Sequence, residues 1–208
     1  MADTDPETKP SERIPTEAEA REYVRGILRY IGEDPNREGL LETPDRVVKS
    51  FAEHYAGYEQ NPETYLSKVF EEVEGYDDLV LVSDIEVYSH CEHHMVPFVG
   101  KAHVAYIPNG RVVGLSKLAR VVDVFAKRLQ VQEKLTAQIA RSIDQALKPQ
   151  GTAVILQCQH FCMCYRGVRK PGSWTTTSKL LGAFMNEPSA RMELLTLVGM
   201  PRGIGGHG

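Results

Sequence analysis

Residues 79–94 read LVLVSDIEVYSHCEHH, and the rest of the chain is best interpreted around them. The first ten are dominated by aliphatic and β-branched residues and predict a strand. The last six place one thiol and three imidazoles within five positions. Thiolate sulfur and imidazole nitrogen are the ligands that zinc prefers. Cys91 and His94 stand three apart, so a helical turn would bring both side chains to one ion, and a third ligand must come from elsewhere.

A second group of thiols and one imidazole supplies candidates for the third ligand. Cys158, His160, Cys162 and Cys164 have the same parity within a strand predicted over residues 152–165. Because side chains along a strand alternate between its two faces, all four are expected on one face of the sheet. Spacing does not select among them, and a buried structural thiol is the commoner role for a single cysteine. If only one joins, three protein ligands leave the open position of a catalytic zinc site, where bound water has a pKa of about 7.

The composition is that of an ordinary soluble domain. The chain has 208 residues, of which 42% are hydrophobic and 25% charged, and a formal net charge of −4. Such a charge provides no global basic field, so nucleic acid is not expected as a partner. No apolar run approaches the roughly 20 residues that span a bilayer, and the acidic N-terminus is unlike a signal peptide. We therefore expect a cytoplasmic protein without membrane association, whose four cysteines act as ligands, reactive thiols or core residues.

The order of periodic segments predicts an α+β fold with an N-terminal helical extension. Residues 1–15 are expected to form a disordered tail, 16–75 the helical extension, 76–200 the catalytic domain and 201–208 a flexible tail. A capping box formed by Thr16 and Glu19 should begin the first helix. The expected helices cover residues 16–32, 43–57, a short segment from 61, 114–125, 132–147 and 188–198, and the expected strands cover 79–88, 97–107, 152–165 and 175–184. Two strands, two helices and two strands favour an antiparallel sheet with both helices on one face.

Two stretches without acidic residues suggest an anionic ligand. Residues 93–122 and 160–180 contain no Asp or Glu but carry several Lys and Arg side chains. Ser116 and Lys117 stand at a predicted helix start, where free N–H groups and the helix dipole attract anions. This pattern favours a polyphosphate ligand over an ordinary scatter of surface lysines. Arg46 and Lys49 form a basic stripe on the second helix, either a solvated face or a further ligand contact.

Glu133 follows Gln132 in otherwise basic surroundings. A single carboxylate at the bottom of a pocket can accept two hydrogen bonds, from the N1–H and the 2-amino group of a guanine.

Several separated motifs resemble the GTP cyclohydrolase I family. They are CEHH at 91–94 with VPFVG at 96–100, GLSKLAR at 114–120, RLQVQE at 128–133, HFC at 160–162 with RG at 166–167, and TPDR at 43–46. The resemblance extends from about Glu17 to Val198 in the family's order and spacing.

The resemblance implies the tunnelling fold, in which subunits associate side by side and close a β-barrel. It also implies a homodecamer of two stacked pentamers, with active sites between subunits. The implied reaction converts GTP and water to 7,8-dihydroneopterin triphosphate and formate, the first step toward folate or related pterins.

The resemblance also implies residue roles. Zinc, or iron(II) in the cell, would be held by Cys91, His94 and Cys162. The catalytic residues would be His93, His160 and Ser116. The residues in contact with GTP would be Gln132, Glu133, Lys117, Arg120, Arg166, Arg46 and Lys49. Cys158 and Cys164 receive no role.

Two other readings are open at this point. A related tunnelling-fold enzyme acting on another pterin or a deazapurine could share the guanine-holding Glu133, but it would not need the metal ligands together with phosphate-binding arginines. A zinc-stabilised module without activity would usually have four closed ligands. Release of formate from GTP separates the three readings.

Overall fold

The computed structural model describes residues 13–71 and 75–200. The predicted tails over 1–15 and 201–208 lie outside these ranges, apart from residues 13–15. Contacts divide the chain into two compact units, one up to Glu53 and one from His54 onward. The domain boundary predicted at residue 75 stays a prediction.

The first unit consists of helices, as predicted. Helix α1 covers Glu17–Tyr30, the 3-10 turn η1 covers Glu38–Leu40 and helix α2 covers Thr43–His54. The capping box is present, because the Thr16 side chain accepts a hydrogen bond from the Glu19 N–H and the Glu19 carboxylate accepts one from the Thr16 N–H at 2.8 Å. An ion pair between Arg21 and Asp45 at 3.0 Å joins α1 to α2.

The second unit is built on a five-stranded sheet with the order β5-β2-β3-β6-β7. Its strands are β2 (Val80–Cys91), β3 (Val96–Ile107), β5 (Leu129–Gln130), β6 (Gly151–His160) and β7 (Thr175–Gly182). All neighbours are antiparallel except the short β5, which runs parallel to β2. A separate pair, β1 (Val69–Phe70) and β4 (Val112–Val113), forms a second small sheet.

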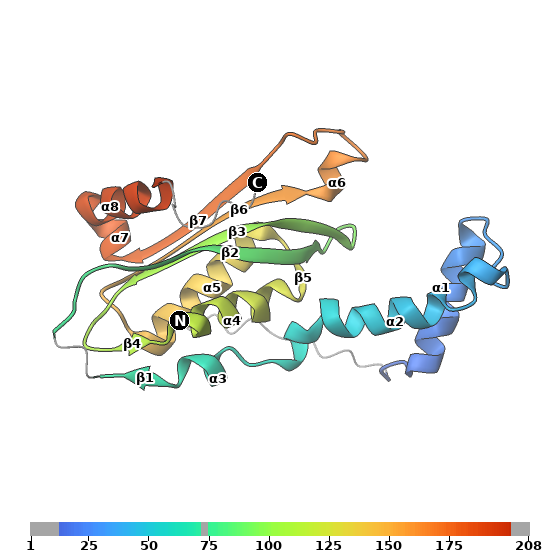
Figure 1. The fold of residues 1–208 in the computed structure, drawn as a ribbon, viewed down its shortest axis with the longest axis horizontal. Helices are drawn as coiled ribbons and strands as arrows, with labels where there is room; N and C mark the ends of the chain where they lie inside the picture. Colours follow the sequence, from blue (N-terminus) through green and yellow to red (C-terminus); the bar gives the residue numbers. More distant parts are fainter. Residues whose placement is uncertain (1–12, 72–74, 201–208) are drawn as a thin grey trace. The chain divides into compact units, whose positions relative to one another are not determined.

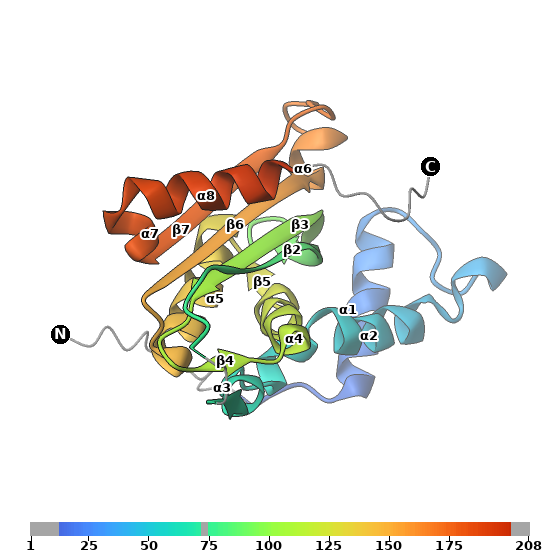
Figure 2. The same ribbon diagram turned by 60° about the vertical axis from the view of Figure 1, so that its left-hand side comes forward.

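Helices cover both faces of the main sheet (Figure 1 and Figure 2). The helices of this unit are η2 (Ala56–Glu59), α3 (Glu63–Leu66), α4 (Leu115–Ala126), α5 (Gln132–Leu147), α6 (Phe161–Cys164), α7 (Ala183–Asn186) and α8 (Pro188–Gly199). The long helices α4 and α5 lie together on one face, which confirms the predicted α+β arrangement. The last helix, α8, lies on the opposite face.

Alternation along the strands explains why both faces are covered. On β3, Val104 and Tyr106 belong to the large core beneath α4 and α5, whereas Ala105 belongs to a smaller cluster with Leu194 of α8. Because successive side chains of a strand point to opposite faces, a fully apolar run needs apolar partners on both sides. The smaller cluster covers only one end of the strands; the other end of that face stays open.

Strand β6 is shorter than predicted. It ends at His160, and Phe161–Cys164 form the helical turn α6. The expectation that Cys162 and Cys164 point to the same face of a strand as Cys158 is therefore wrong, although the apolar sequence there is compatible with a strand. The ladder with β3 stops at the pair Phe98 and His160, and the next residue of β3 is Pro97, which has no N–H to donate.

Among the described helices, none combines the length and the apolar character that a membrane-spanning segment requires.

Candidate active site

The end of β2 presents the Cys91 and His94 side chains through a single tight turn. Cys91 is the last residue of β2 and is 7% exposed. The N–H groups of His94 and Met95 donate to the Cys91 carbonyl oxygen, at 3.3 and 2.8 Å. Met95 takes a positive φ of 52°, which ends the turn and lets β3 begin at Val96. The chain thus folds back over Cys91, as the spacing of three predicted.

The helical turn α6 brings Cys162 to the same place. Among the described residues, one group of three or more potential metal ligands is close together: Cys91, His94 and Cys162, with one ligand atom of each within 4.8 Å of the others. Ligand atoms around a tetrahedral zinc ion stand about 3.5–3.8 Å apart, so small adjustments of these side chains would suffice. Two thiolates and one imidazole also match the chemistry of zinc.

The remaining two thiols are occupied differently. Cys158 is fully buried in the core, and burial raises the pKa of its thiol to about 12. The Cys164 thiol donates to the His160 carbonyl oxygen at 3.1 Å. Neither belongs to the ligand group, so Cys162 is the thiol that the fold brings close to Cys91 and His94.

Electrostatic interactions within the ligand group of Cys91, His94 and Cys162 favour the binding of a cation. Burial raises the pKa of the Cys162 thiol, and the charge and the hydrogen bond of the neighbouring Cys91 raise it further, whereas Arg166 opposes them. Two thiolates this close repel each other, and a divalent cation between them reverses that repulsion. The residues present therefore fit a bound zinc ion.

His160 lies beside this group at the end of β6. Its ring is stacked on that of Phe98, its cross-strand partner, with centroids 4.6 Å apart and an interplanar angle of 12°. Its Nε2 lies 2.7 Å from Oε1 of Gln132. Burial lowers the pKa of His160, and the nearby charge of Glu133 partly opposes that shift.

A cavity of about 230 Å³ unites most of the predicted site. It is lined by Cys91, His93, His94, Gln130, Val131, Gln132, Glu133, His160, Cys162, Met163 and Thr175. The first turn of α5 supplies Gln132 and Glu133, because β5 pairs with the end of β2 through Cys91 and Gln130 and so starts α5 next to the ligand group. The three candidate metal ligands, two further histidines and a carboxylate therefore line one cavity.

Sequence reasoning missed four lining residues: Gln130, Val131, Met163 and Thr175. Two of them belong to the motif RLQVQE and could have been noted there. Met163 and Thr175 carry no comparable signal, since their positions depend on the helical turn α6 and on the start of β7.

The predicted phosphate contacts lie outside the cavity. Ser116 and Lys117 stand in the first turn of α4, and the Arg120 guanidinium lies over the Tyr65 ring at 5.8 Å from its centroid. Arg166 lies close enough for its charge to act on Cys162.

The basic stripe of α2 belongs to the other unit, where both of its side chains have acidic partners. Lys49 pairs with Asp45 at 2.6 Å, and Arg46 pairs with Glu42.

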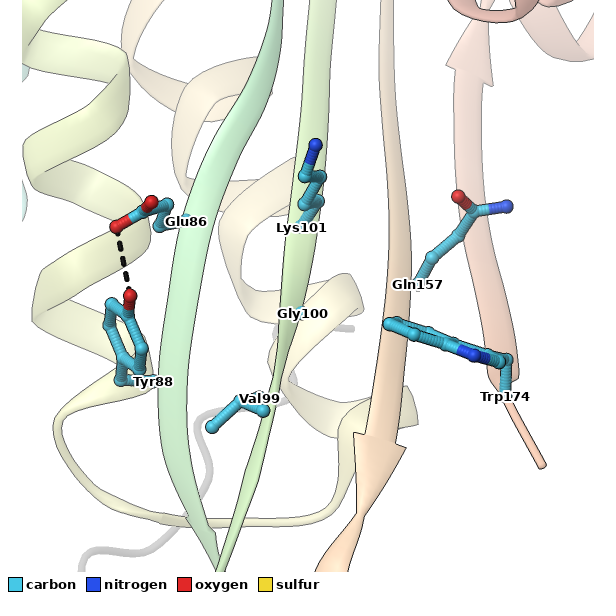
Figure 3. A pocket seen from close by; sticks show the side chains of 7 residues that line it. All are labelled: Glu86, Tyr88, Val99, Gly100, Lys101, Gln157 and Trp174. Atoms are coloured by element: carbon cyan, nitrogen blue, oxygen red, sulfur yellow. Dashed lines mark hydrogen bonds between the residues drawn. The ribbon is translucent and has the colours of Figure 1, made fainter. Parts of the chain in front are cut away.

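A second cavity, of about 420 Å³, lies on the sheet face that α4 and α5 leave uncovered (Figure 3). The Glu86 carboxylate accepts a hydrogen bond from the Tyr88 hydroxyl at 2.9 Å, and the Trp174 indole extends from the start of β7 toward β6. No cysteine or histidine is among the residues that line this cavity, so the chemistry expected from the sequence belongs to the smaller one.

Comparison with known proteins gives matches over most of the chain. The family model described as GTP cyclohydrolase I matches residues 20–199. The chain is 58% identical over 184 residues to GTP cyclohydrolase 1 of Sinorhizobium fredii (strain NBRC 101917 / NGR234), covering 88% of this chain and 90% of that protein. It is 57% identical over 184 residues to GTP cyclohydrolase 1 of Brucella abortus (strain S19), covering 88% of this chain and 86% of that protein.

Among solved structures, the archaeosine synthase QueF-Like in the apo form matches with a TM-score of 0.42 and 19% identity, covering 50% of this chain and 93% of that chain. That likeness is too low to carry an argument.

Proposed function

Because this chain belongs to the GTP cyclohydrolase I family, we propose that it opens the guanine imidazole ring of GTP by hydrolysis at C8. The products are formate and 7,8-dihydroneopterin triphosphate, with a net consumption of one water. The observation that carries the proposal is the cavity in which the ligand group Cys91, His94 and Cys162 stands beside His160 and Glu133.

The number of ligands supports a catalytic metal. Structural zinc sites are closed by four protein ligands, whereas catalytic sites have three and an open position. Three ligands gather in the described part of the chain, and their cluster lines a cavity. A zinc ion bound there, or iron(II) in the cell, would supply hydroxide at neutral pH by lowering the pKa of water.

His160 is proposed as the proton donor to guanine N7. C8 is a poor electrophile until N7 is protonated, and an imidazole exchanges protons near neutral pH. Opening of the C8–N9 bond and a second hydrolysis release formate. The ribosyl amine must then open its sugar ring, rearrange and close onto the pyrimidine amine, and we propose His93 and Ser116 for proton transfers in these steps.

Glu133 is proposed to hold the base. It stands in the first turn of α5, lines the cavity and is close enough to act on His160. One carboxylate oxygen can accept from N1–H and the other from the 2-amino group, which would orient N7 and C8 toward His160 and the ligand group.

The triphosphate is proposed to extend beyond this cavity. A volume of about 230 Å³ is below the roughly 300–1,000 Å³ of ordinary ligand pockets. Basic and hydroxyl side chains outside the cavity are the proposed contacts: Ser116, Lys117, Arg120, Arg166, Arg46 and Lys49. The small cavity supports a site completed by a neighbouring subunit.

We further propose a homodecamer of two stacked pentamers, located in the cytoplasm and acting at the start of folate or tetrahydropterin synthesis. Family membership supports an oligomeric enzyme, and the decamer with sites between its subunits is the specific form proposed.

The test is release of formate from GTP by the zinc-loaded full-length chain, measured together with the pterin fluorescence of the product after oxidation. Cys91→Ser serves as the inactive control. We expect formate and pterin in equal amounts from the native protein and neither from the variant. Absence of formate with a fully metal-loaded protein would refute the proposed function.

A further inference from the structure

The Gln132 side chain is buried, and both of its polar atoms are used within the chain. Gln132 is 1% exposed. Its Nε2 lies 3.2 Å from the Leu156 carbonyl oxygen, 3.0 Å from the Thr175 carbonyl oxygen and 3.0 Å from Oγ1 of Thr177. Its Oε1 lies 2.7 Å from Nε2 of His160. Each polar atom of this side chain therefore already has a partner within the chain.

The partners fix which way the amide points. Carbonyl oxygens only accept hydrogen bonds, so the NH₂ group must face Leu156 and Thr175. The opposite orientation would set Oε1 against two acceptors. Oε1 therefore faces His160, and because an amide oxygen only accepts, the Nε2 atom of His160 must carry the hydrogen.

Two threonine hydroxyls continue this network, and the direction in which each one donates its hydrogen is fixed. Oγ1 of Thr136 donates to the Gln132 carbonyl oxygen at 2.7 Å. Its hydrogen is then used, so the 2.7 Å contact between the two hydroxyls requires Thr177 to donate to Thr136. Thr177 in turn accepts from the Gln132 amide. The network joins α5, β6 and β7, and it leaves the amide one stable orientation.

His160 is thus held in two ways. Stacking on Phe98, at an interplanar angle of 12°, fixes the plane of the ring. The hydrogen bond to Gln132 fixes its rotation within that plane and reserves Nε2. The nitrogen that remains for a substrate in the cavity is Nδ1.

We propose that Gln132 is a positioning residue for His160 and not a contact to guanine, the role that family resemblance implies for it. The inference rests on the proposed function. In this assignment His160 gives its Nδ1 hydrogen to guanine N7 and keeps its Nε2–H bonded to Gln132 throughout. Glu133, next in sequence, alone holds the polar edge of the base.

The first test is Gln132→Met, which keeps the length of the side chain and removes both the acceptor and the donors. In the zinc-loaded chain we expect kcat to fall about 10- to 100-fold, less than the 10²–10⁴-fold that a general acid contributes, because His160 itself is still present. KM for GTP and metal content should stay unchanged. Gln150→Met is the matched control, since the side-chain amide of Gln150 donates to the Pro108 carbonyl oxygen and Gln150 does not line the cavity. That control should leave both kinetic constants unchanged.

A double-mutant cycle separates positioning from general damage to the fold. If Gln132 acts only through His160, Gln132→Met should lower single-turnover formate release no further in a His160→Ala background. GTP affinity, measured by calorimetry in that background, should also stay the same. Thr177→Val is a second variant that a strand tolerates easily, and it loosens the Gln132 amide by removing one of the three acceptors around it. It should lower kcat several-fold with KM unchanged, again with no added loss in the His160→Ala background.

Three outcomes would overturn the inference: a rise in KM or loss of GTP affinity in Gln132→Met, losses that multiply with His160→Ala, or an unchanged kcat in Gln132→Met. The first would make Gln132 a base contact. Failure of the native chain to release formate would instead overturn the proposed function, so the two failures are distinguishable.

Discussion

At the scale of single residues, the surroundings of the four cysteines predict different responses to substitution. Cys91→Ser, His94→Ala and Cys162→Ser should each abolish metal binding and turnover, because a site with three ligands loses an essential one. Cys164→Ser and Cys158→Ala should retain both, since the thiol of Cys164 bonds to a carbonyl oxygen and Cys158 lies in the core. Metal analysis of the five purified variants tests this. Loss of metal in Cys164→Ser with retention in Cys162→Ser would exchange their roles.

Glu133 should determine affinity for the base. Glu133→Ala leaves two hydrogen-bond donors of guanine unpaired, and each unpaired donor costs about 1–3 kcal/mol of binding free energy. We therefore expect GTP affinity to fall at least about tenfold, with unchanged metal content. Inosine triphosphate lacks the 2-amino group and should lose less affinity on the same substitution. The neighbouring Lys134→Ala is the control and should bind GTP as the native chain does. Unaltered GTP affinity in Glu133→Ala, measured by calorimetry, would place the base elsewhere.

At the scale of elements, the close approach of β3 and β6 depends on Gly100. A Cβ atom there would lie 1.9 Å from the Gln157 carbonyl oxygen and 2.6 Å from the Cys158 Cα, and neither atom belongs to a flexible side chain. Overpacking of this kind lowers the free energy of unfolding by about 1–3 kcal/mol. Gly100→Ala should therefore lower the urea midpoint. It should also lower kcat, because the Phe98–His160 pair stands two residues away on the same ladder.

Gly26→Ala is the matched control for this effect. Gly26 lies within α1, and a Cβ there meets nothing within 4 Å. Alanine in the interior of a helix is favoured over glycine by about 0.5–1 kcal/mol, so this variant should be as stable as the native chain or more so. Equal urea midpoints for Gly100→Ala and the native protein would show that the strands can separate without cost.

Individual elements show what the sequence can predict and what it cannot. The helix predicted over 132–147 is Gln132–Leu147 in the structure, because a clear 3.6-residue period ends at Pro149 and Gly151. The end of β6 was missed, because Phe161–Cys164 are as compatible with a strand as with a turn and the decision depends on a partner strand. The two-residue β5 is too short to give a pattern, although it is what places α5 beside Cys91. The use of Gln132 by four partners follows only from packing in three dimensions.

At the scale of the whole molecule, the sheet has edges that the described part of this chain does not pair. The outermost strands are β5 and β7, and β5 pairs only with His90 and Cys91 at the end of β2. Most of the outer edge of β2 and the whole outer edge of β7 are therefore available for another strand. Long unpaired edges are normally covered or closed, and subunits paired edge to edge in a ring would satisfy them.

If neighbouring chains share each site, two inactive variants should restore each other. Mixing Cys91→Ser with Arg120→Ala, under conditions that allow subunit exchange, should recover a fraction of the native rate of formate release. Mixing Cys91→Ser with Cys162→Ser is the control and should recover none, because both residues belong to the same ligand group of one chain. A monomer by light scattering would refute the ring. An oligomer that never shows complementation would mean that each site is built within one chain.

The open cavity on the uncovered sheet face contains the only tryptophan of the sequence, Trp174, which is 62% exposed. An indole in contact with water emits at longer wavelength than one in an apolar environment, and the sequence contains no second indole. The native sequence thus carries its own fluorescent label on the sheet face that α4 and α5 leave uncovered. Dilution that dissociates a ring of subunits should shift the emission of Trp174. A small molecule that enters the cavity should quench the Trp174 emission without any change in formate release.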